Sequence, residues 1–386
     1  MNTTAGASRP RHILIFSLSY YPLGIGGAEV AVKEITDRLS KGEFAFDMIT
    51  LGDGRGVQEE TIGNVAVHRI FKKVSTVSKL LYPFAAFRAA KRLHCARPYD
   101  DVWSIMASYA GYAGFLFKNK HPEIPLVLTI QEGDHFARRQ GVLNRWFKKI
   151  FHAADRIQVI SNFLADWSGQ MGATCPITVV PNGVDFDGFS QPLLADARAA
   201  LRRSLGFSPN DIVLVTASRL VFKNATDDII TALTYLDPSC KLLILGAGPD
   251  EAKLKDQVAK LKFDSRVLFK GFVTHADLPG YLQASEIFVR PSRSEGLGNS
   301  FLEAMAAGIP VIATPVGGIP DFLRDGETGL FCEVDNPRSI AQKVEKLIKD
   351  RESRGYIVKQ AREMVMNKYG WQKVAADMKT ILTASN

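Results

Sequence analysis

The stretch Arg290–Gly318, RPSRSEGLGNSFLEAMAAGIPVIATPVGG, places a glycine-rich turn and a short helix between two strands. Gly296 and Gly298 allow the backbone to bend sharply and bring its amide groups close to a ligand. Ser300 is a good N-cap, so we expect a helix to begin there and to end before a strand at 311–313. The unpaired amides at such a helix start suit an anionic ligand.

Two glutamates in this stretch, Glu295 and Glu303, each have two interpretations. Ser300-Phe301-Leu302-Glu303 fits a capping box, in which Glu303 only reaches back to the first amide of the helix. Glu295, beside glycines on a loop, fits an ordinary solvated carboxylate. From spacing alone, a binding role and a structural role stay open for both residues.

Apolar strand-like runs alternate with helical patterns along the whole chain, which predicts parallel sheets covered on both faces. At 386 residues the chain exceeds the ~250 to 300 at which a single core stops growing, so we expect two domains. The predicted fold class is α/β, with two Rossmann-like, doubly wound domains facing each other across a cleft. We expect a first domain at 1–190, a second at 191–365 and a terminal helix within 366–386.

The expected strands lie near the apolar runs of each half. They are residues 12–18, 46–51, 65–70, 101–106, 126–130, 156–160 and 177–180 in the first half, and 212–216, 241–245, 266–269, 286–290, 311–313 and 329–332 in the second. Ligands bind at the carboxyl ends of such strands, so the loops that follow them should line the site.

Composition narrows the class of protein. No run approaches the ~18 to 20 apolar residues that span a bilayer, and the start of the chain is polar, so we expect a cytoplasmic protein. The four cysteines are scattered without Cys-x-x-Cys spacing, which argues against a zinc site or a disulfide framework. The net charge is +8, and residues 62–98 contain no acid, a field that attracts anionic lipid, phosphate or nucleic acid. Motifs of nucleic-acid-binding modules are absent, so we expect no nucleic-acid partner.

A resemblance follows from several motifs. Seven residues separate Glu295 from Glu303, and Ala-Met-Ala-x-Gly-x-Pro-Val and a Gly-Gly pair follow. This pattern resembles the donor-sugar signature of retaining GT-B glycosyltransferases. This is glycosyltransferase family four (group 1), which includes sucrose synthase and phosphatidylinositol mannosyltransferase. Gly26-Gly27-Ala28-Glu29, Val180-Pro181-Asn182-Gly183-Val184-Asp185 and Ser218-Arg219-Leu220 recur in the family's order, so the resemblance spans nearly the whole chain. It also implies that the terminal helix packs back on the first domain.

The resemblance implies a role for each part of the donor site. Glu303 would hold the ribose hydroxyls and Glu295 the hydroxyls of the donor sugar. Breaking a sugar–diphosphate bond puts negative charge on the departing phosphate, which must be met by cations, amides or a metal. The implied diphosphate ligands are the cations Arg219 and Lys223 and the amides of Gly296, Leu297, Gly298, Asn299 and Ser300. The family's lysine usually falls five residues after the arginine, where this chain has Asn224 instead.

Other candidate positions carry weaker signals. Gly26 and Gly27 open a helix whose amides suit a phosphate or an acceptor, although a plain turn explains them equally well. Gly246 and Gly248 form a similar turn, which the family uses to shape the nucleotide cleft. Where the family often has a histidine after the strand at 126–130, this chain has Gln131, which can donate a hydrogen bond but cannot titrate.

The nearby Glu132, Asp134 and His135 are possible substitutes for that histidine, although a solvated loop is the commoner fate of such residues. Asp185-Phe186-Asp187 resembles the metal clamp of other glycosyltransferases. Turn chemistry after Pro181-Asn182-Gly183 explains those aspartates, so we expect no metal and no other cofactor.

We therefore expect a retaining, metal-independent transfer of a sugar from a UDP- or GDP-linked donor to an acceptor hydroxyl. The expected acceptor is lipid-linked or a glycan, in cell-envelope or polysaccharide synthesis. Two alternatives remain, a nucleotide-sugar epimerase and a non-catalytic membrane-binding protein on a GT-B scaffold.

Two basic stretches, Arg69–Arg97 and Arg138–Arg156, interleave bases with large apolar residues, as interfacial helices do. They predict docking of the first domain on an anionic membrane surface. In the alternative interpretation, the apolar residues face the domain core and the bases form an ordinary solvated helix face.

Overall fold

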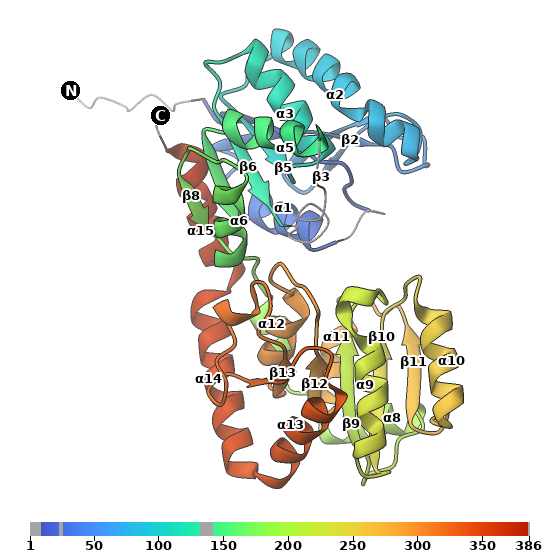
Figure 1. The fold of residues 1–386 in the computed structure, drawn as a ribbon. Coiled ribbons are helices and arrows are strands. Elements are labelled where there is room, and N and C mark those ends of the chain that lie inside the picture. Colours follow the sequence, from blue (N-terminus) through green and yellow to red (C-terminus); the bar gives the residue numbers. More distant parts are fainter. Residues whose placement is uncertain (1–8, 23–25, 132–141, 385–386) are drawn as a thin grey trace, which may run out of the picture. The chain divides into compact units, whose positions relative to one another are not determined.

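The computed structural model describes residues 9–22, 26–131 and 142–384. The chain forms two compact units (Figure 1). Unit 1 comprises Met1–Asn182 and Trp371–Asn386, and unit 2 comprises Gly183–Gly370. The chain leaves unit 1 within the turn Pro181-Asn182-Gly183, earlier than the expected residue 190, because the short helix α7 (Phe186–Ser190) packs within unit 2.

In its described residues, unit 1 contains an eight-stranded sheet in the order β3-β4-β2-β1-β5-β6-β7-β8. Its strands are β1 (Arg11–Phe16), β2 (Phe44–Leu51), β3 (Glu59–Ile62), β4 (Val65–Ile70), β5 (Asp101–Ile105), β6 (Leu126–Ile130), β7 (Arg156–Val159) and β8 (Ile177–Val179). Its helices are α1 (Gly27–Arg38), α2 (Thr76–Ala96), α3 (Tyr109–Lys120), α5 (Val142–Ala153), α6 (Asn162–Gln170) and α15 (Trp371–Thr383). The neighbouring strands are parallel except for β3 and β4.

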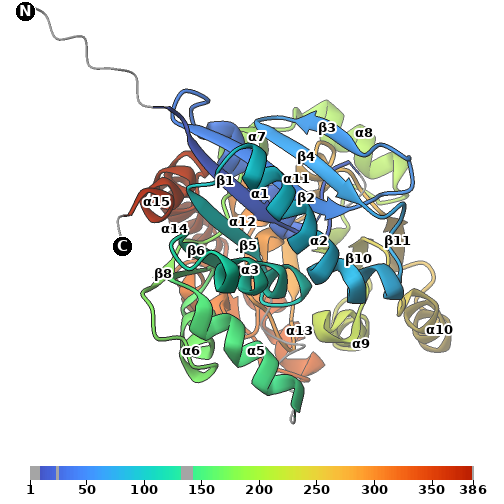
Figure 2. The same cartoon turned by 90° about the horizontal axis from the view of Figure 1, so that it is seen from above.

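The two faces of this sheet carry separate hydrophobic cores. Along β1, Ile13 and Ile15 pack in one core with α1 and α15, whereas Leu14 and Phe16 pack in the other with α2 and α3. Successive side chains of a strand point to opposite faces, so a continuous apolar run is what a doubly covered sheet requires. Helices α2 and α3 lie side by side on their face (Figures 1 and 2).

Helix α15 belongs to the core of unit 1, although it is the last helix of the chain. Trp371 and Met378 are buried in the same core as α1. The buried Arg156 donates a hydrogen bond to the main-chain oxygen of Ile381. On its exposed side, Lys379 pairs with Glu43 at 2.7 Å.

Strand β3 is the one strand that the sequence interpretation missed in the described chain. It pairs antiparallel with β4 across the two-residue turn Gly63-Asn64, in which Gly63 has a φ of +60°. Glycine adopts this conformation without strain. A Gly-Asn pair between two short runs is a hairpin signal, so the turn itself was the clue.

In the described residues, unit 2 contains a six-stranded sheet in the order β11-β10-β9-β12-β13-β14, with neighbours parallel. Its strands are β9 (Ile212–Ala217), β10 (Cys240–Leu245), β11 (Val267–Gly271), β12 (Ile287–Arg290), β13 (Val311–Ala313) and β14 (Leu330–Phe331). Its other α-helices are α8 (Ala195–Ser204), α9 (Thr226–Ala232), α10 (Glu251–Leu261), α11 (Leu278–Gln283), α12 (Asn299–Ala306), α13 (Pro337–Lys349) and α14 (Arg351–Lys368). Short 3₁₀ helices are η1 (Phe222–Asn224), η2 (Leu233–Tyr235) and η3 (Ile319–Asp321).

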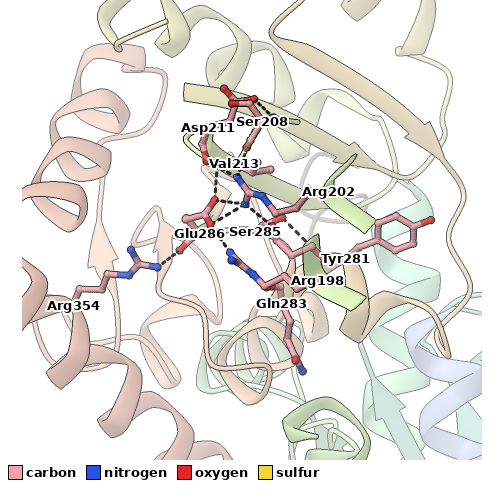
Figure 3. A network of polar contacts seen from close by, with 11 residues as sticks. Arg198, Arg202, Ser208, Asp211, Val213, Tyr281, Gln283, Ser285, Glu286 and Arg354 are labelled. Carbon is pink, nitrogen blue, oxygen red and sulfur yellow. Dashed lines mark hydrogen bonds and ion pairs between the residues drawn. The ribbon is translucent and has the colours of Figure 1, made fainter. Parts of the chain in front are cut away.

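The start of β12 is fixed by a polar network around Glu286, on which three arginines converge (Figure 3). Arg202 donates to both carboxylate oxygens at 2.9 and 3.0 Å, and Arg198 forms a second ion pair. Arg354 donates to the main-chain oxygen at 3.1 Å. The Val213 amide also donates to the carboxylate, so the network ties α8, α14 and β9 to β12. It lies where β9 and β12 begin, at the edge opposite to their carboxyl ends.

Among the described helices, none combines the length and the hydrophobicity that a membrane-spanning segment requires.

Candidate active site

The glycine-rich turn and α12 follow the carboxyl end of β12 in unit 2. The cap of α12 is Gly298, whose φ of +90° is left-handed, and not Ser300 as expected. A Cβ at Gly298 would lie 2.5 Å from a ring carbon of Phe301, so glycine is required there on two grounds. In the described chain, the main-chain N–H groups of Gly298 and Ser300 have no recorded hydrogen-bond partner.

The capping box expected as an alternative for Glu303 does not form. The Ser300 hydroxyl accepts a hydrogen bond from Arg290 Nη1 at 3.0 Å. The Glu303 carboxylate, 13% exposed, instead lies 3.2 Å from Nε2 of His275. Glu303 is therefore a largely buried acid on the first turns of a helix, with no role in closing that helix.

Glu295 is buried, so its interpretation as a solvated loop carboxylate is wrong. One carboxylate oxygen pairs with Arg290 and the other accepts from the Gly296 amide at 3.1 Å. Its main-chain oxygen accepts from the Gly318 amide at 3.2 Å, and a Cβ at Gly317 would lie 1.8 Å from that oxygen. The Gly-Gly pair of the sequence motif thus lets the chain pack directly on the backbone of Glu295.

Arg290, at the end of β12, is a residue of this site that sequence reasoning missed. It donates to Ser300, to Glu295 and, at 2.9 Å, to Oδ1 of Asn224. Asn224 is buried and donates in turn to the main-chain oxygen of Arg219 at 2.6 Å. The sequence does contain a signal for Arg290, since it is a charged residue at the end of an apolar run that predicts a strand.

The two cations expected at this edge have no acid partner among the described residues. Arg219 is exposed and Lys223 is partly exposed, and no ion pair of either is recorded within the described residues. By contrast, Arg293 nearby pairs with Asp227, Asp228 and Asp335. The positive charges of Arg219 and Lys223 are therefore available to an anion, whereas that of Arg293 is compensated.

Gly246 and Gly248 are required by packing. A Cβ at Gly246 would lie 2.0 Å from the main-chain oxygen of Ser218, and one at Gly248 would lie 2.2 Å from that of Leu220. The turn after β10 therefore packs directly on the segment that carries Arg219. This contact supports the shape of the site, and it does not require a ligand.

The candidate residues of unit 1 have partners of their own. The Gly26 amide donates to the Glu29 carboxylate at 3.0 Å, so a side chain already occupies the helix start at Gly26-Gly27. Gln131 accepts from Nδ2 of Asn182 at 3.1 Å. Glu132, Asp134 and His135 lie outside the described residues.

Asp185 caps α7, since its carboxylate accepts from the Gly188 amide at 3.1 Å. This is the turn chemistry expected of it. Within the part of the chain that the structure describes, no group of three or more His, Cys, Asp or Glu side chains could hold a metal ion.

The basic stretches are only partly surface features. Arg69 is buried and paired with Glu60, and Arg156 is buried beside Asp101. Ile150 and Phe151 of α5 face the core of unit 1. The core interpretation is correct for Ile150 and Phe151, whereas the buried Arg69 and Arg156 fit neither interpretation. Helix α2 retains an exposed apolar face.

Both halves of the chain match known family descriptions. Residues 25–187 match "Glycosyltransferase Family 4", and residues 197–364 match "Glycosyl transferases group 1". An uncharacterised glycosyltransferase of Methanocaldococcus jannaschii is 27% identical over 380 residues, 95% of this chain and 96% of that protein. A GDP-mannose-dependent alpha-(1-6)-phosphatidylinositol monomannoside mannosyltransferase of Mycobacterium tuberculosis is 30% identical over 246 residues, 61% of this chain and 63% of that protein.

Solved structures share the fold. Sucrose-phosphate synthase from Thermosynechococcus elongatus aligns with a TM-score of 0.85 at 21% identity, over 96% of this chain and 98% of that one. Anabaena HepE, solved in complex with UDP-glucose, aligns with a TM-score of 0.81 at 20% identity, over 96% of this chain and 99% of that one.

Proposed function

Because the chain belongs to the group 1 glycosyltransferases and has their GT-B fold, we propose that it transfers a sugar from a UDP- or GDP-linked donor to an acceptor hydroxyl, with retention and without a metal. One observation carries the proposal. Glu295 and Glu303 both lie at the carboxyl end of β12, and neither is a helix cap or a solvated surface acid.

The departing diphosphate would meet positive charge from several sources. Arg219 and Lys223 have no acid partner recorded in the described chain, and the Gly298 and Ser300 amides at the start of α12 are unpaired there. Fixed cations and amides aimed at developing negative charge are a major source of rate enhancement. Because these groups supply the charge, we propose that no metal is needed.

Glu295 is proposed to orient the donor sugar and not to attack it. Both of its oxygens are already engaged, one by Arg290 and one by the Gly296 amide. A carboxylate held in this way can accept further hydrogen bonds from sugar hydroxyls, but it is poorly placed as a nucleophile. In this account, the leaving phosphate itself takes the acceptor proton on the same face of the sugar, which retains the configuration.

The test is a thermal-shift screen with UDP, GDP, ADP and their sugars. A ligand that binds only the folded protein raises its apparent stability, by about 2.7 kcal/mol at a hundredfold excess over Kd. We expect one nucleotide series to raise the Tm of the wild type and to raise that of Glu303→Ala much less. No shift with any nucleotide would refute the proposed donor site. A similar shift in both proteins would refute the role of Glu303.

The acceptor is proposed to be lipid-linked, and the observation that favours this is the outer face of α2. Val77, Leu80, Leu81 and Phe84 are 64%, 57%, 49% and 54% exposed. Their spacing of i, i+3, i+4 and i+7 places them on one face of the helix, which we call the outer stripe.

The outer stripe does not face the core of unit 1. The opposite face of α2 packs inward, with Tyr82, Ala86 and Ala90 fully buried. The Tyr82 hydroxyl donates to the main-chain oxygens of Ser17 and Ile49. A helix that is apolar on both faces needs cover on its outer side, and exposed apolar stripes of this kind mark interaction sites.

The surroundings of the stripe suit an anionic membrane. Phe71, 39% exposed, is held in a left-handed conformation with a φ of +62°, which is unusual for an aromatic residue. Lys72 and Lys73 next to it are exposed, and residues 62–98 carry no acid. Each base near an anionic leaflet contributes about 1 kcal/mol, so a few bases with inserted apolar side chains give reversible docking. The expected cytoplasmic location stays a prediction.

Vesicle sedimentation tests this part of the proposal. We expect the wild type to sediment with anionic vesicles at low ionic strength and to be released at high ionic strength. Serine at the four positions of the outer stripe should abolish sedimentation without lowering the Tm, because these side chains are exposed. A second variant replaces the bases Lys72, Lys73, Lys79, Arg88, Lys91 and Arg92 with glutamine. It should weaken binding to anionic vesicles and leave any binding to neutral vesicles unchanged. Equal sedimentation with neutral lipid, or an unaffected stripe variant, would favour a soluble glycan acceptor.

A further inference from the structure

His275 lies in the turn between β11 and α11, next to the side chain of Glu303. The turn is closed by Thr274, whose main-chain oxygen accepts from the Leu278 amide at 3.0 Å and whose hydroxyl donates to Asp277 at 2.6 Å. This geometry brings Nε2 of His275 to 3.2 Å from Oε1 of Glu303.

The imidazole is held in place although 57% of the side chain is exposed. The ring of Phe189 contacts it edge-on, with the centroids 5.1 Å apart and the planes at 68°. Phe189 is buried on α7, and its main-chain oxygen accepts from Gln283 of α11 at 3.0 Å. The imidazole therefore lies between a fixed aromatic ring and the carboxylate.

The contact fixes Oε1 of the Glu303 carboxylate and leaves Oε2 available to a ligand. No hydrogen bond to Oε2 of Glu303 is recorded in the described chain. A carboxylate has about four acceptor positions, and a neutral imidazole uses one of them by donating its Nε2–H. The remaining positions suit the two vicinal hydroxyls of a ribose, provided that the carboxylate does not rotate. Holding the carboxylate in its binding orientation removes an entropy loss that binding would otherwise incur.

We propose that His275 is a positioning residue for Glu303 and that it sets the preference of the site for ribonucleotides over 2′-deoxyribonucleotides. The inference rests on the proposed function, in which Glu303 holds the ribose. It adds a residue on a different loop whose effect depends on the 2′-hydroxyl.

Calorimetric titration of the full chain with UDP, GDP, 2′-deoxy-UDP and 2′-deoxy-GDP tests the inference. We expect His275→Ala to weaken binding of the preferred ribonucleotide by about fivefold to tenfold, the range expected for one hydrogen bond. Binding of its 2′-deoxy form should change less than about twofold on the same scale. His275→Gln, whose amide can donate from nearly the same place, should restore most of the discrimination. Lys270→Ala, an exposed change on β11, is the matched control and should alter neither affinity.

A second arm separates positioning from general damage to the site. In a Glu303→Gln background, His275→Ala should have no further effect on the ratio of the two affinities, because the group that it positions has changed. If His275→Ala weakens binding of the ribo and 2′-deoxy forms equally, or weakens neither, the ratio of the two affinities is unchanged. That result would overturn the inference while leaving the proposed function intact. Failure of the wild type to bind either ribonucleotide would overturn both.

Discussion

The guanidinium of Arg290 and the carboxylate of Glu295 form an ion pair in which each side chain is only 9% exposed. The pair joins the last residue of β12 to the glycine-rich turn, and through Asn224 it also reaches η1. Three segments that the proposed reaction uses are thereby fixed by one side chain. The aromatic face of Phe301, 5.1 Å from the guanidinium carbon, adds a cation–π contact.

Removing only one charge of this pair should be strongly destabilising. Arg290→Gln leaves the Glu295 carboxylate buried without its cation, and such changes cost about 3 to 5 kcal/mol. We expect a large drop in Tm and a loss of transfer for Arg290→Gln. The double variant Arg290→Gln/Glu295→Gln should recover much of the stability but none of the transfer. Thermal unfolding of the four proteins in a double-mutant cycle measures this, and additive changes in stability would contradict it.

Arg219 and Lys223 should contribute unequally to turnover. Arg219 is exposed and directly follows Ser218, on whose main-chain oxygen Gly246 packs. Its guanidinium offers a fork of donors that matches a phosphate. We expect Arg219→Ala to lower kcat by about 10² to 10³, the range for one strong transition-state donor, and Lys223→Ala to lower it less. Both variants should keep the wild-type Tm, because neither side chain has a recorded ion pair in the described chain. An Arg219→Ala enzyme with normal kcat would contradict this assignment.

Transfer should survive chelation of divalent metal ions. Asp185 is engaged in capping α7, where its carboxylate accepts from Gly188. We expect the initial rate to be unchanged by EDTA, and Asp185→Asn, which retains the capping acceptor, to remain active. Inactivation by EDTA that manganese reverses would contradict this prediction and make Asp185 and Asp187 candidate metal ligands again.

The stability of unit 1 should depend on pH through His68. The Asp47 carboxylate, 3.6 Å from Nε2 of His68, raises the pKa of His68 above its usual 6.5, and Glu59 adds to the effect. Because the pKa of His68 is raised in the folded state, the stability that its charged form contributes is complete below about pH 6.5. This contribution is lost as the pH rises through the pKa of His68 in the folded protein. His68→Gln should therefore lower stability at pH 5.5, by about 0.5 kcal/mol for a partly exposed pair, and have less effect at pH 9. The same loss of Tm at both pH values would count against this account.

Much of the fold could be predicted from the sequence because buried parallel strands are continuous apolar runs. The expected run at 65–70 coincides with β4, and that at 126–130 with β6. Strand β3 could not be found in this way, since EETI is too short and too polar to form an apolar run. Its antiparallel pairing depends on the Gly63-Asn64 turn and not on burial.

The sequence indicated which residues are candidates for the site, but not how they are connected. Spacing placed Glu295 and Glu303 together, but it could not separate a cap from a binding residue. That distinction depends on Gly298, whose left-handed backbone starts the helix before Ser300. The contact of Glu303 on α12 with His275 joins residues 28 positions apart, and the contact of Glu295 with Arg290 joins the glycine-rich turn to the end of β12. A linear pattern reveals neither contact.

The most direct test of the glycosyltransferase assignment is the release of nucleoside diphosphate from UDP-, GDP- and ADP-sugars by wild type, Glu295→Ala and Glu303→Ala. Glu303 does not cap α12, so its loss should change stability by less than the ~1 kcal/mol expected for a cap while abolishing turnover. We predict that the wild type releases nucleoside diphosphate from one donor series. Both variants should release it at least a hundredfold more slowly, in line with the loss of a group that orients the reacting sugar. The Tm of Glu303→Ala should stay near that of the wild type. Near-normal release by Glu303→Ala together with a lowered Tm, or no release by the wild type from any donor, would contradict the assignment.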